Sequence, residues 1–244
     1  NCYRAERPQR GRLREFCQWN CDILGDPSAR ADAELIACCV DLMRSLRLTP
    51  EHVKVRISHR GAVEQLLRNR GVTMPDLGPW FALLDRVGKI PSDDFLTEGQ
   101  KLGLPPSDGA ILLRSITQST PFEERTTELF LSDAVGGKGP EYFRELFAEL
   151  KGAGVADWCV LNLGIVRGLA YYTGMVFEVH EVSGRERAIA GGGRYDGLIE
   201  LFGGPSTPAI GFGMGDAVLS LVLQDRKLFP QDAELAGMTG VRPD

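Results

Sequence analysis

Apolar and polar positions along the first part of the chain alternate in ways that predict strands and one helix. Residues 2–6 and 14–24 have the composition of strands, and the basic segment between them suits a hairpin with a long loop. Residues 53–57 (VKVRI) alternate as a half-buried strand does. Asp32 is predicted to cap a helix. The apolar positions of this helix recur at helical spacing, at Leu35, Ile36, Cys39, Leu42, Met43 and Leu46.

The pattern changes between residues 61 and 156, where short helical segments dominate. One of them carries an apolar stripe at helical spacing, which we expect to pack in the core rather than to bind a cofactor. The stripe consists of Tyr142, Phe143, Leu146, Phe147 and Leu150. We therefore predict a helical insertion over residues 61–156, between two parts of one core at 1–60 and 157–244.

Strands return after the insertion. Residues 158–163 and 175–182 read as strands, and a run of glycines follows at 191–193. Residues 208–213 read as a strand that leads into a helix from about 216 to 224. Strands, then helices, then strands again favour an α+β fold with an antiparallel sheet flanked by helices over an alternating parallel fold.

Composition narrows the class of protein. The net charge of −5 argues against a broad nucleic-acid face. No apolar run approaches the roughly 20 residues needed to span a bilayer, and the first residues do not form a signal peptide, so we expect a cytoplasmic protein with no membrane partner. The six cysteines form no Cys-x-x-Cys pair and only three histidines are present, so no metal site is predicted.

The basic loop of the predicted hairpin is the first candidate site. Guanidinium groups bind phosphate in bidentate fashion, and five of them are concentrated here in an acidic protein. Phe16, Gln18 and Asp22 follow the loop on one face of a strand, offering a stacking surface, an amide and a carboxylate. An exposed basic hairpin beside an ordinary strand is the alternative interpretation. The loop arginines are Arg4, Arg7, Arg10, Arg12 and Arg14.

Two glycine-containing segments are further candidates. Residues 167–174 (RGLAYYTG) place an arginine and a tyrosine pair between glycines, as in a loop that closes over a small ligand, or in a turn with half-buried tyrosines. Residues 191–197 (GGGRYDG) let the backbone approach a ligand closely because no Cβ intervenes. This run matches neither the dinucleotide-binding fingerprint nor the P-loop.

Taken together, these segments resemble histidyl-tRNA synthetases. Residues 3–18 (YRAERPQRGRLREFCQ) are similar to that family's version of the class II motif 2. RGLAYYTG resembles its first histidine motif, usually written RGLDYYTG, and AGGGRYDGL resembles the second. PAIGFGMG is similar to the start of motif 3. The resemblance implies a class II synthetase-like antiparallel sheet with a helical insertion. It also implies a histidine-tRNA ligase, which forms histidyl-adenylate from histidine and ATP and transfers histidine to its tRNA.

The resemblance also implies roles for residues of the basic loop. Arg4 would hold the α-phosphate of ATP as a catalytic residue, and Arg12 would reach the outer phosphates. Glu6 would belong to the same ATP site, and Phe16 would stack on adenine. Mg²⁺ would accompany ATP without a dedicated cage of protein ligands.

Other matching positions would bind histidine. Arg167 would be the catalytic arginine, stabilising charge while the histidine carboxylate attacks the α-phosphorus. The expected histidine-binding set is Gln18, Asp22, Arg167, Tyr171, Tyr172, Gly192, Gly193 and Arg194. L-histidine, ATP and histidine tRNA are the expected partners, and a homodimer is expected of the full-length protein.

The chain departs from the family pattern at several points. Ala170 replaces the aspartate of RGLDYYTG, and Val218 stands where class II enzymes usually have an ATP-binding arginine. The sequence begins at motif 2 and shows no anticodon-binding domain after about residue 230, so we expect a fragment or a degenerate relative. These departures leave an alternative function: a synthetase-like regulatory subunit of ATP phosphoribosyltransferase, which binds histidine without activating it.

Overall fold

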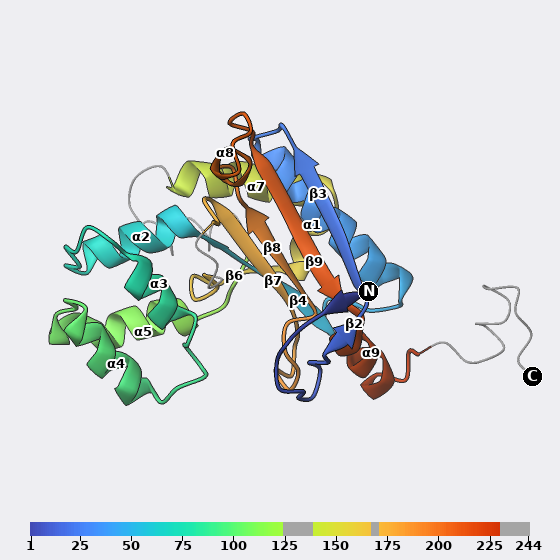
Figure 1. The fold of residues 1–244 in the computed structure, drawn as a ribbon, viewed down its shortest axis with the longest axis horizontal. Helices are drawn as coiled ribbons and strands as arrows, with labels where there is room; N and C mark the ends of the chain where they lie inside the picture. Colours follow the sequence, from blue (N-terminus) through green and yellow to red (C-terminus); the bar gives the residue numbers. More distant parts are fainter. Residues whose placement is uncertain (124–138, 167–170, 230–244) are drawn as a thin grey trace, which may run out of the picture.

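The computed structural model describes residues 1–123, 139–166 and 171–229. In this part of the chain, one sheet has seven strands in the order β3-β9-β8-β7-β4-β6-β5 (Figure 1). All neighbouring strands are antiparallel except β4 and β6. The strands are β3 (Gln18–Leu24), β4 (Val53–His59), β5 (Thr120–Pro121), β6 (Cys159–Leu161), β7 (Met175–Glu181), β8 (Ala190–Arg194) and β9 (Ala209–Gly215). The expected antiparallel sheet is confirmed.

A separate hairpin precedes the sheet. Strand β1 (Cys2–Tyr3) pairs antiparallel with β2 (Glu15–Phe16), and the basic loop connects them. The single strand expected over residues 14–24 is therefore two elements, β2 and β3. The break between them is at Cys17. Its carbonyl accepts a hydrogen bond from the backbone N–H of Asp216 at 3.0 Å and takes no part in the ladder between β1 and β2.

Helices α1 (Ala29–Ser45) and α7 (Gly139–Gly152) pack against each other behind the sheet. The prediction that Asp32 caps α1 is wrong. Ser28 is the N-cap, since its hydroxyl accepts a hydrogen bond from the backbone N–H of Ala31 at 3.3 Å, and α1 begins several residues earlier than expected. Asp32 is instead fully buried in the first turn.

Four helices after β4 lie together to one side of the sheet in Figure 1. They are α2 (Arg60–Asn69), α3 (Gly78–Leu84), α4 (Ser92–Lys101) and α5 (Gly109–Thr117), with 3₁₀ turns at Pro106–Asp108 and, before β6, at Ala156–Trp158. The later elements of residues 61–156 return to the sheet, because β5 pairs with β6 and α7 packs on α1. The boundaries of the proposed insertion stay a prediction.

Two further helices follow β8 and β9. Helix α8 (Leu198–Leu201) is a short turn after β8, and α9 (Asp216–Asp225) begins directly after β9. The helix expected from about 216 to 224 is confirmed. No helix in the described part of the chain is long and apolar enough to cross a membrane.

Candidate active site

Glycines form the floor of the main cavity. Paired residues in an antiparallel ladder share one face of the sheet, and β3, β9 and β8 align two such rows. The first row consists of Asn20, Gly213 and Gly191. The second consists of Asp22, Gly211 and Gly193. At these paired positions β8 and β9 therefore present no side chains to a cavity of about 560 Å³.

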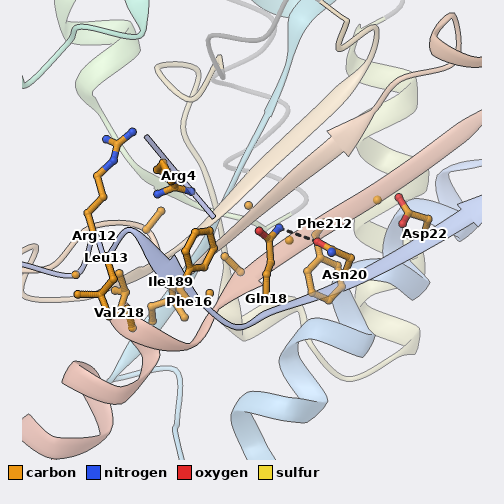
Figure 2. A pocket seen from close by; sticks show the side chains of 18 of the residues that line it. Arg4, Arg12, Leu13, Phe16, Gln18, Asn20, Asp22, Ile189, Phe212 and Val218 are labelled. Atoms are coloured by element: carbon orange, nitrogen blue, oxygen red, sulfur yellow. Dashed lines mark hydrogen bonds between the residues drawn. The ribbon is translucent and has the colours of Figure 1, made fainter. Parts of the chain in front are cut away.

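Polar side chains of β3 form one wall of this cavity (Figure 2). Gln18, Asn20 and Asp22 all line it, and the Gln18 amide donates a hydrogen bond to the Asn20 side-chain oxygen at 2.7 Å. These side chains lie over the glycines of β9. A Cβ at Gly211 would lie 1.8 Å from the Asp22 carboxylate, and one at Gly213 would lie 2.1 Å from the Gln18 amide nitrogen. The glycines of PAIGFGMG thus make room for the polar row.

Three tyrosines lie at the end of the cavity that holds Asp22. Tyr195 donates a hydrogen bond to the Asp22 carboxylate, and burial, together with that contact, raises the pKa of the Tyr195 hydroxyl. The Tyr171 ring lies 4.7 Å from that of Tyr172 and 6.3 Å from that of Tyr195, measured between centroids. All of these tyrosines line the cavity. This end can enclose a small ligand between flat rings and one carboxylate.

The hairpin supplies the opposite, cationic end of the cavity. Arg4, Arg12 and Phe16 line it, and the Arg4 guanidinium lies 4.6 Å from the centre of the Phe16 ring. Arg12 forms an ion pair with Glu6, which does not itself line the cavity. One face of Phe16 is therefore covered by Arg4, so a planar base has to stack on the other face or displace the guanidinium.

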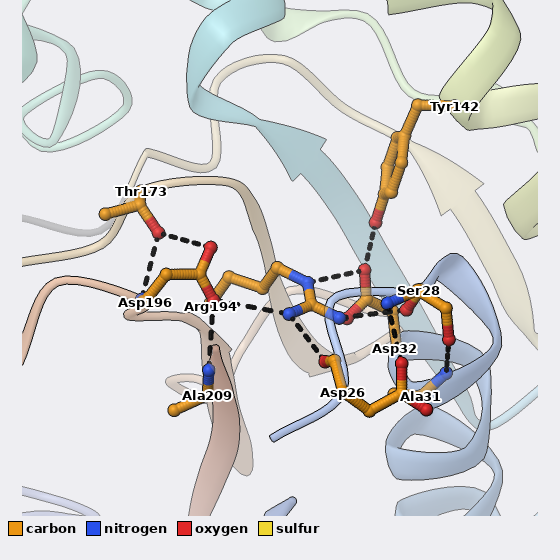
Figure 3. Close-up of polar contacts among 9 residues, drawn as sticks. All are labelled: Asp26, Ser28, Ala31, Asp32, Tyr142, Thr173, Arg194, Asp196 and Ala209. Atoms are coloured by element: carbon orange, nitrogen blue, oxygen red, sulfur yellow. Dashed lines mark hydrogen bonds and ion pairs between the residues drawn. The ribbon is translucent and has the colours of Figure 1, made fainter. Parts of the chain in front are cut away.

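Arg194 points away from the cavity. It lies opposite Ile210 in the ladder, on the face of β8 that is turned toward α1. There its guanidinium forms an ion pair with Asp32 at 2.8 Å and donates to the backbone carbonyls of Asp26 and Ser28 (Figure 3). The structure does not bring Arg194 to the expected histidine pocket, and it gives this residue a buried partner in the helix layer instead.

The remaining expected residues either do not line the cavity or lie outside the described residues. Gly192 and Gly193 lie in β8 but do not line the cavity. A Cβ on either would collide with backbone of a neighbouring strand, at 2.1 Å from the Gly211 oxygen and 2.5 Å from the Met175 oxygen. Glycine is therefore required at both positions so that the neighbouring strands can approach β8. Arg167, the expected catalytic arginine, and Ala170 lie outside the described residues.

Sequence reasoning missed several residues of the cavity. Asn20 could have been found, since it lies midway between Gln18 and Asp22 on the same strand face. Tyr195 was part of the GGGRYDG segment, but only the three-dimensional structure shows its bond to Asp22. The glycines of β9 could be recognised as a run, whereas their positions beneath a polar row depend on strand pairing across the chain.

Comparison with solved structures identifies the class of fold. The chain superposes on "ATP phosphoribosyltransferase regulatory subunit/histidyl-tRNA synthetase" from Bacillus halodurans with a TM-score of 0.72 and 24% identity, covering 91% of this chain and 55% of that one. Histidyl-tRNA synthetase from Nostoc sp. PCC 7120 gives a TM-score of 0.72 at 21% identity, covering 89% and 52%. With its antiparallel sheet and arginine hairpin, the chain has the fold of a class II aminoacyl-tRNA synthetase core.

Sequence comparison gives the family. The family model described as histidyl-tRNA synthetase matches residues 1–215, and the chain belongs to this family. It is 37% identical over 232 residues to "Histidine--tRNA ligase, chloroplastic/mitochondrial" of Arabidopsis thaliana, covering 94% of this chain and 46% of that protein. Histidine--tRNA ligase of Thermoplasma volcanium is 37% identical over 224 residues, covering 92% and 51%. The chain thus spans about half the length of these curated relatives.

Proposed function

We propose that the protein to which this chain belongs is a histidine-tRNA ligase, and that this chain carries the site where histidine is activated. The observation that carries the proposal is a single cavity with two chemically different ends. One end has Arg4, Arg12 and Phe16, suited to a nucleotide, and the other has Asp22 among tyrosines, suited to a small cationic ligand. Family membership then selects ATP and histidine as the ligands.

Activation requires a carboxylate of histidine to attack the α-phosphorus of ATP, with pyrophosphate as the leaving group. Two anions must approach each other, so fixed positive charge at the α-phosphate is the main requirement. Arg4 supplies it from the hairpin, and Arg167 is proposed to supply a second guanidinium. Gln18, Asn20 and Asp22 position the amino acid so that its carboxylate faces the hairpin.

Mg²⁺ is proposed to enter with ATP. No three His, Cys, Asp or Glu side chains of the described residues converge as a metal site would require. Phosphate oxygens of ATP, several waters and one or two carboxylates would share its coordination, as is common for Mg²⁺. When bound, the ion would neutralise phosphate charge alongside the arginines.

The decisive experiment is histidine-dependent exchange of pyrophosphate into ATP, measured on the longest native form of the protein. Exchange with histidine and not with other amino acids is expected. Arg167→Ala is expected to lower the exchange rate by a few hundred-fold, because loss of one such contact costs roughly 3–4 kcal/mol. Histidine binding without any exchange would contradict the proposal and favour a regulatory subunit.

Histidine tRNA, a homodimeric state of the whole protein and a cytoplasmic location complete the proposal. They rest on the family resemblance. Transfer of histidine to tRNA, sedimentation of the full-length protein and cell fractionation test them separately.

A further inference from the structure

A second cavity of about 490 Å³ adjoins the first. Both are lined by Arg4, Arg12 and Val218, and also by Gly11 and Ala188, so the two cavities meet beneath the basic loop. We propose that the second cavity binds the outer phosphates of the nucleotide, and that Arg187 is a phosphate-binding residue there. This inference rests on the proposed function for the identity of the nucleotide, but its chemistry is that of any polyphosphate.

The charges that line the second cavity leave a net positive surface. Lys89 forms an ion pair with Asp85 at 3.0 Å, and His180 contacts Glu178 at 2.9 Å, so the acidic side chains here already have partners. Arg4 and Arg187 form no ion pair with any described residue, and Arg12 pairs only with Glu6 outside the cavity. Guanidinium groups without acidic partners at a cavity wall are suited to bidentate contacts with phosphate.

One direct contact joins Arg187 to the basic loop. Its guanidinium donates a hydrogen bond to the side-chain oxygen of Gln9. Gln9 and Arg12 are joined by two backbone hydrogen bonds of 3.0 and 2.9 Å, so the contact fixes Arg187 next to the turn that carries Arg12. The neighbouring Glu186 forms an ion pair of 2.6 Å with Arg10. Two side-chain contacts therefore join the connection between β7 and β8 to the basic loop.

Val218 occupies the position where class II enzymes usually have an ATP-binding arginine, so a cation from elsewhere in the chain would have to replace that charge. Its side chain is nearly fully buried at the start of α9, and a Cβ at Gly11 would lie 3.0 Å from it. An uncharged side chain thus fills the junction of the two cavities and can make no contact with phosphate charge. Arg187, in the connection between β7 and β8, lines the second cavity together with Val218 and supplies the positive charge that Val218 lacks.

The test compares how variants bind ATP and AMP in the absence of histidine, by isothermal titration calorimetry with Mg²⁺ present. Only ATP has the outer phosphates, so Arg187→Gln is expected to weaken ATP binding about tenfold or more and to leave AMP binding within about twofold. Arg185→Gln is the matched control: it removes the same charge from the same connection, but Arg185 lines neither cavity. Arg187→Lys is expected to be intermediate, since lysine keeps the charge without the fork.

Each outcome decides the inference. Equal ATP affinity in Arg187→Gln and the wild type overturns it, as does an equal loss in Arg185→Gln, which would indicate a general charge effect. A wild type that binds ATP no more tightly than AMP also overturns it. The proposed function is tested separately by histidine-dependent exchange. If exchange is absent while Arg187→Gln selectively loses ATP, the function fails and the phosphate site stands.

Discussion

Glycines 211 and 213 contribute to the site by what they lack. Because the side chains of Asp22 and Gln18 lie directly over them, any substituent at these positions occupies space that the polar row needs. The two glycines differ in whether a side chain would disturb the backbone of the sheet as well as the polar row. At Gly213 the nearest atoms to an added Cβ are all from side chains, whereas at Gly211 a backbone oxygen of β3 also lies 3.1 Å away. Gly213 therefore separates function from folding more cleanly.

Gly213→Ala is expected to displace the Gln18 amide while the sheet still forms. We expect histidine-dependent exchange to fall at least about tenfold, as for loss of one positioned hydrogen bond to a charged ligand, with the melting temperature lowered by only a few degrees. Gly197→Ala is the control, because its added Cβ meets nothing within 4 Å. Unchanged exchange in Gly213→Ala would show that Gln18 has no role in positioning the substrate.

His59 makes stability depend on pH. Burial, with a smaller effect of the positive charge on Arg194, lowers the pKa of His59 to about 4. An unfolded histidine has a pKa near 6.5. Between these values the unfolded chain binds a proton that the folded chain does not, so stability falls as the pH falls. The Nδ1 atom also accepts a hydrogen bond from the backbone N–H of Ala62, a contact that requires it to be unprotonated.

The free energy of unfolding is expected to fall by about 2 kcal/mol between pH 7 and pH 5 from this residue alone. Urea denaturation at several pH values measures it. His59→Asn removes the titrating group and keeps a side chain that can cap α2, so its stability is expected to vary less over the same range. Identical pH dependence in the two proteins would exclude His59 as the cause.

At the scale of elements, the pair Arg194–Asp32 joins β8 to α1 through the buried layer. Arg194 contacts Asp32 at 2.8 and 3.1 Å, and Tyr142 of α7 donates a hydrogen bond to the same carboxylate. A strand and two helices thus meet at one carboxylate. Thr173, just before β7, is tied to this cluster through Asp196. The cluster supports the sheet from the face opposite the cavity.

Removal of one partner is expected to be more damaging than removal of both. Asp32→Leu removes the nearer and fully buried carboxylate partner of Arg194 and leaves only the pair with Asp196 at 3.3 Å, so it is expected to lower the free energy of unfolding by about 3 kcal/mol. Asp32→Leu combined with Arg194→Met is expected to lose less than the sum of the single changes. Glu98→Gln at the exposed pair with Arg86 is the control and is expected to cost less than about 1 kcal/mol. Additive losses in the double variant would contradict direct coupling.

The same cluster shows where sequence reasoning about elements reaches its limit. Helix α1 was predicted from its apolar spacing, and the acidic residue in its first turn fitted a cap. Its real partner lies 162 positions away along the chain, and no local pattern reports such a pairing. The break at Cys17 has the same origin, since the group that interrupts the strand is the start of α9.

At the scale of the whole molecule, the succession of strands, then helices, then strands again predicted the α+β class, and family motifs predicted which segments form the site. The order of strands was beyond local reasoning. Strand β3 pairs with β9 from the far end of the chain, and β4 pairs in parallel with β6 after the helices between them. These long-range pairings create the glycine floor, so the cavity itself could not be derived from the separate motifs.

The edge of the sheet carries the last prediction. Strand β3 is an edge strand of the described sheet, and Leu24 at its end is 60% exposed. Tyr195, just before helix α8, donates a hydrogen bond to Asp22 of β3, and at the end of α8 Leu201 and Phe202 are 74% and 83% exposed. Apolar side chains beside an open strand edge favour association with another chain. We therefore expect this chain to self-associate with increasing concentration.

Sedimentation velocity over a range of concentrations tests this expectation. Leu201→Glu combined with Phe202→Glu is expected to weaken self-association at least about tenfold, because burial of even one such side chain contributes roughly 1.5–3 kcal/mol. Ile111→Glu, at an exposed position on α5, is the control and is expected to behave as the wild type. Equal weakening by Ile111→Glu would point to a general effect of added charge. A wild type that stays monomeric at every concentration would show that the exposed edge is protected without a partner.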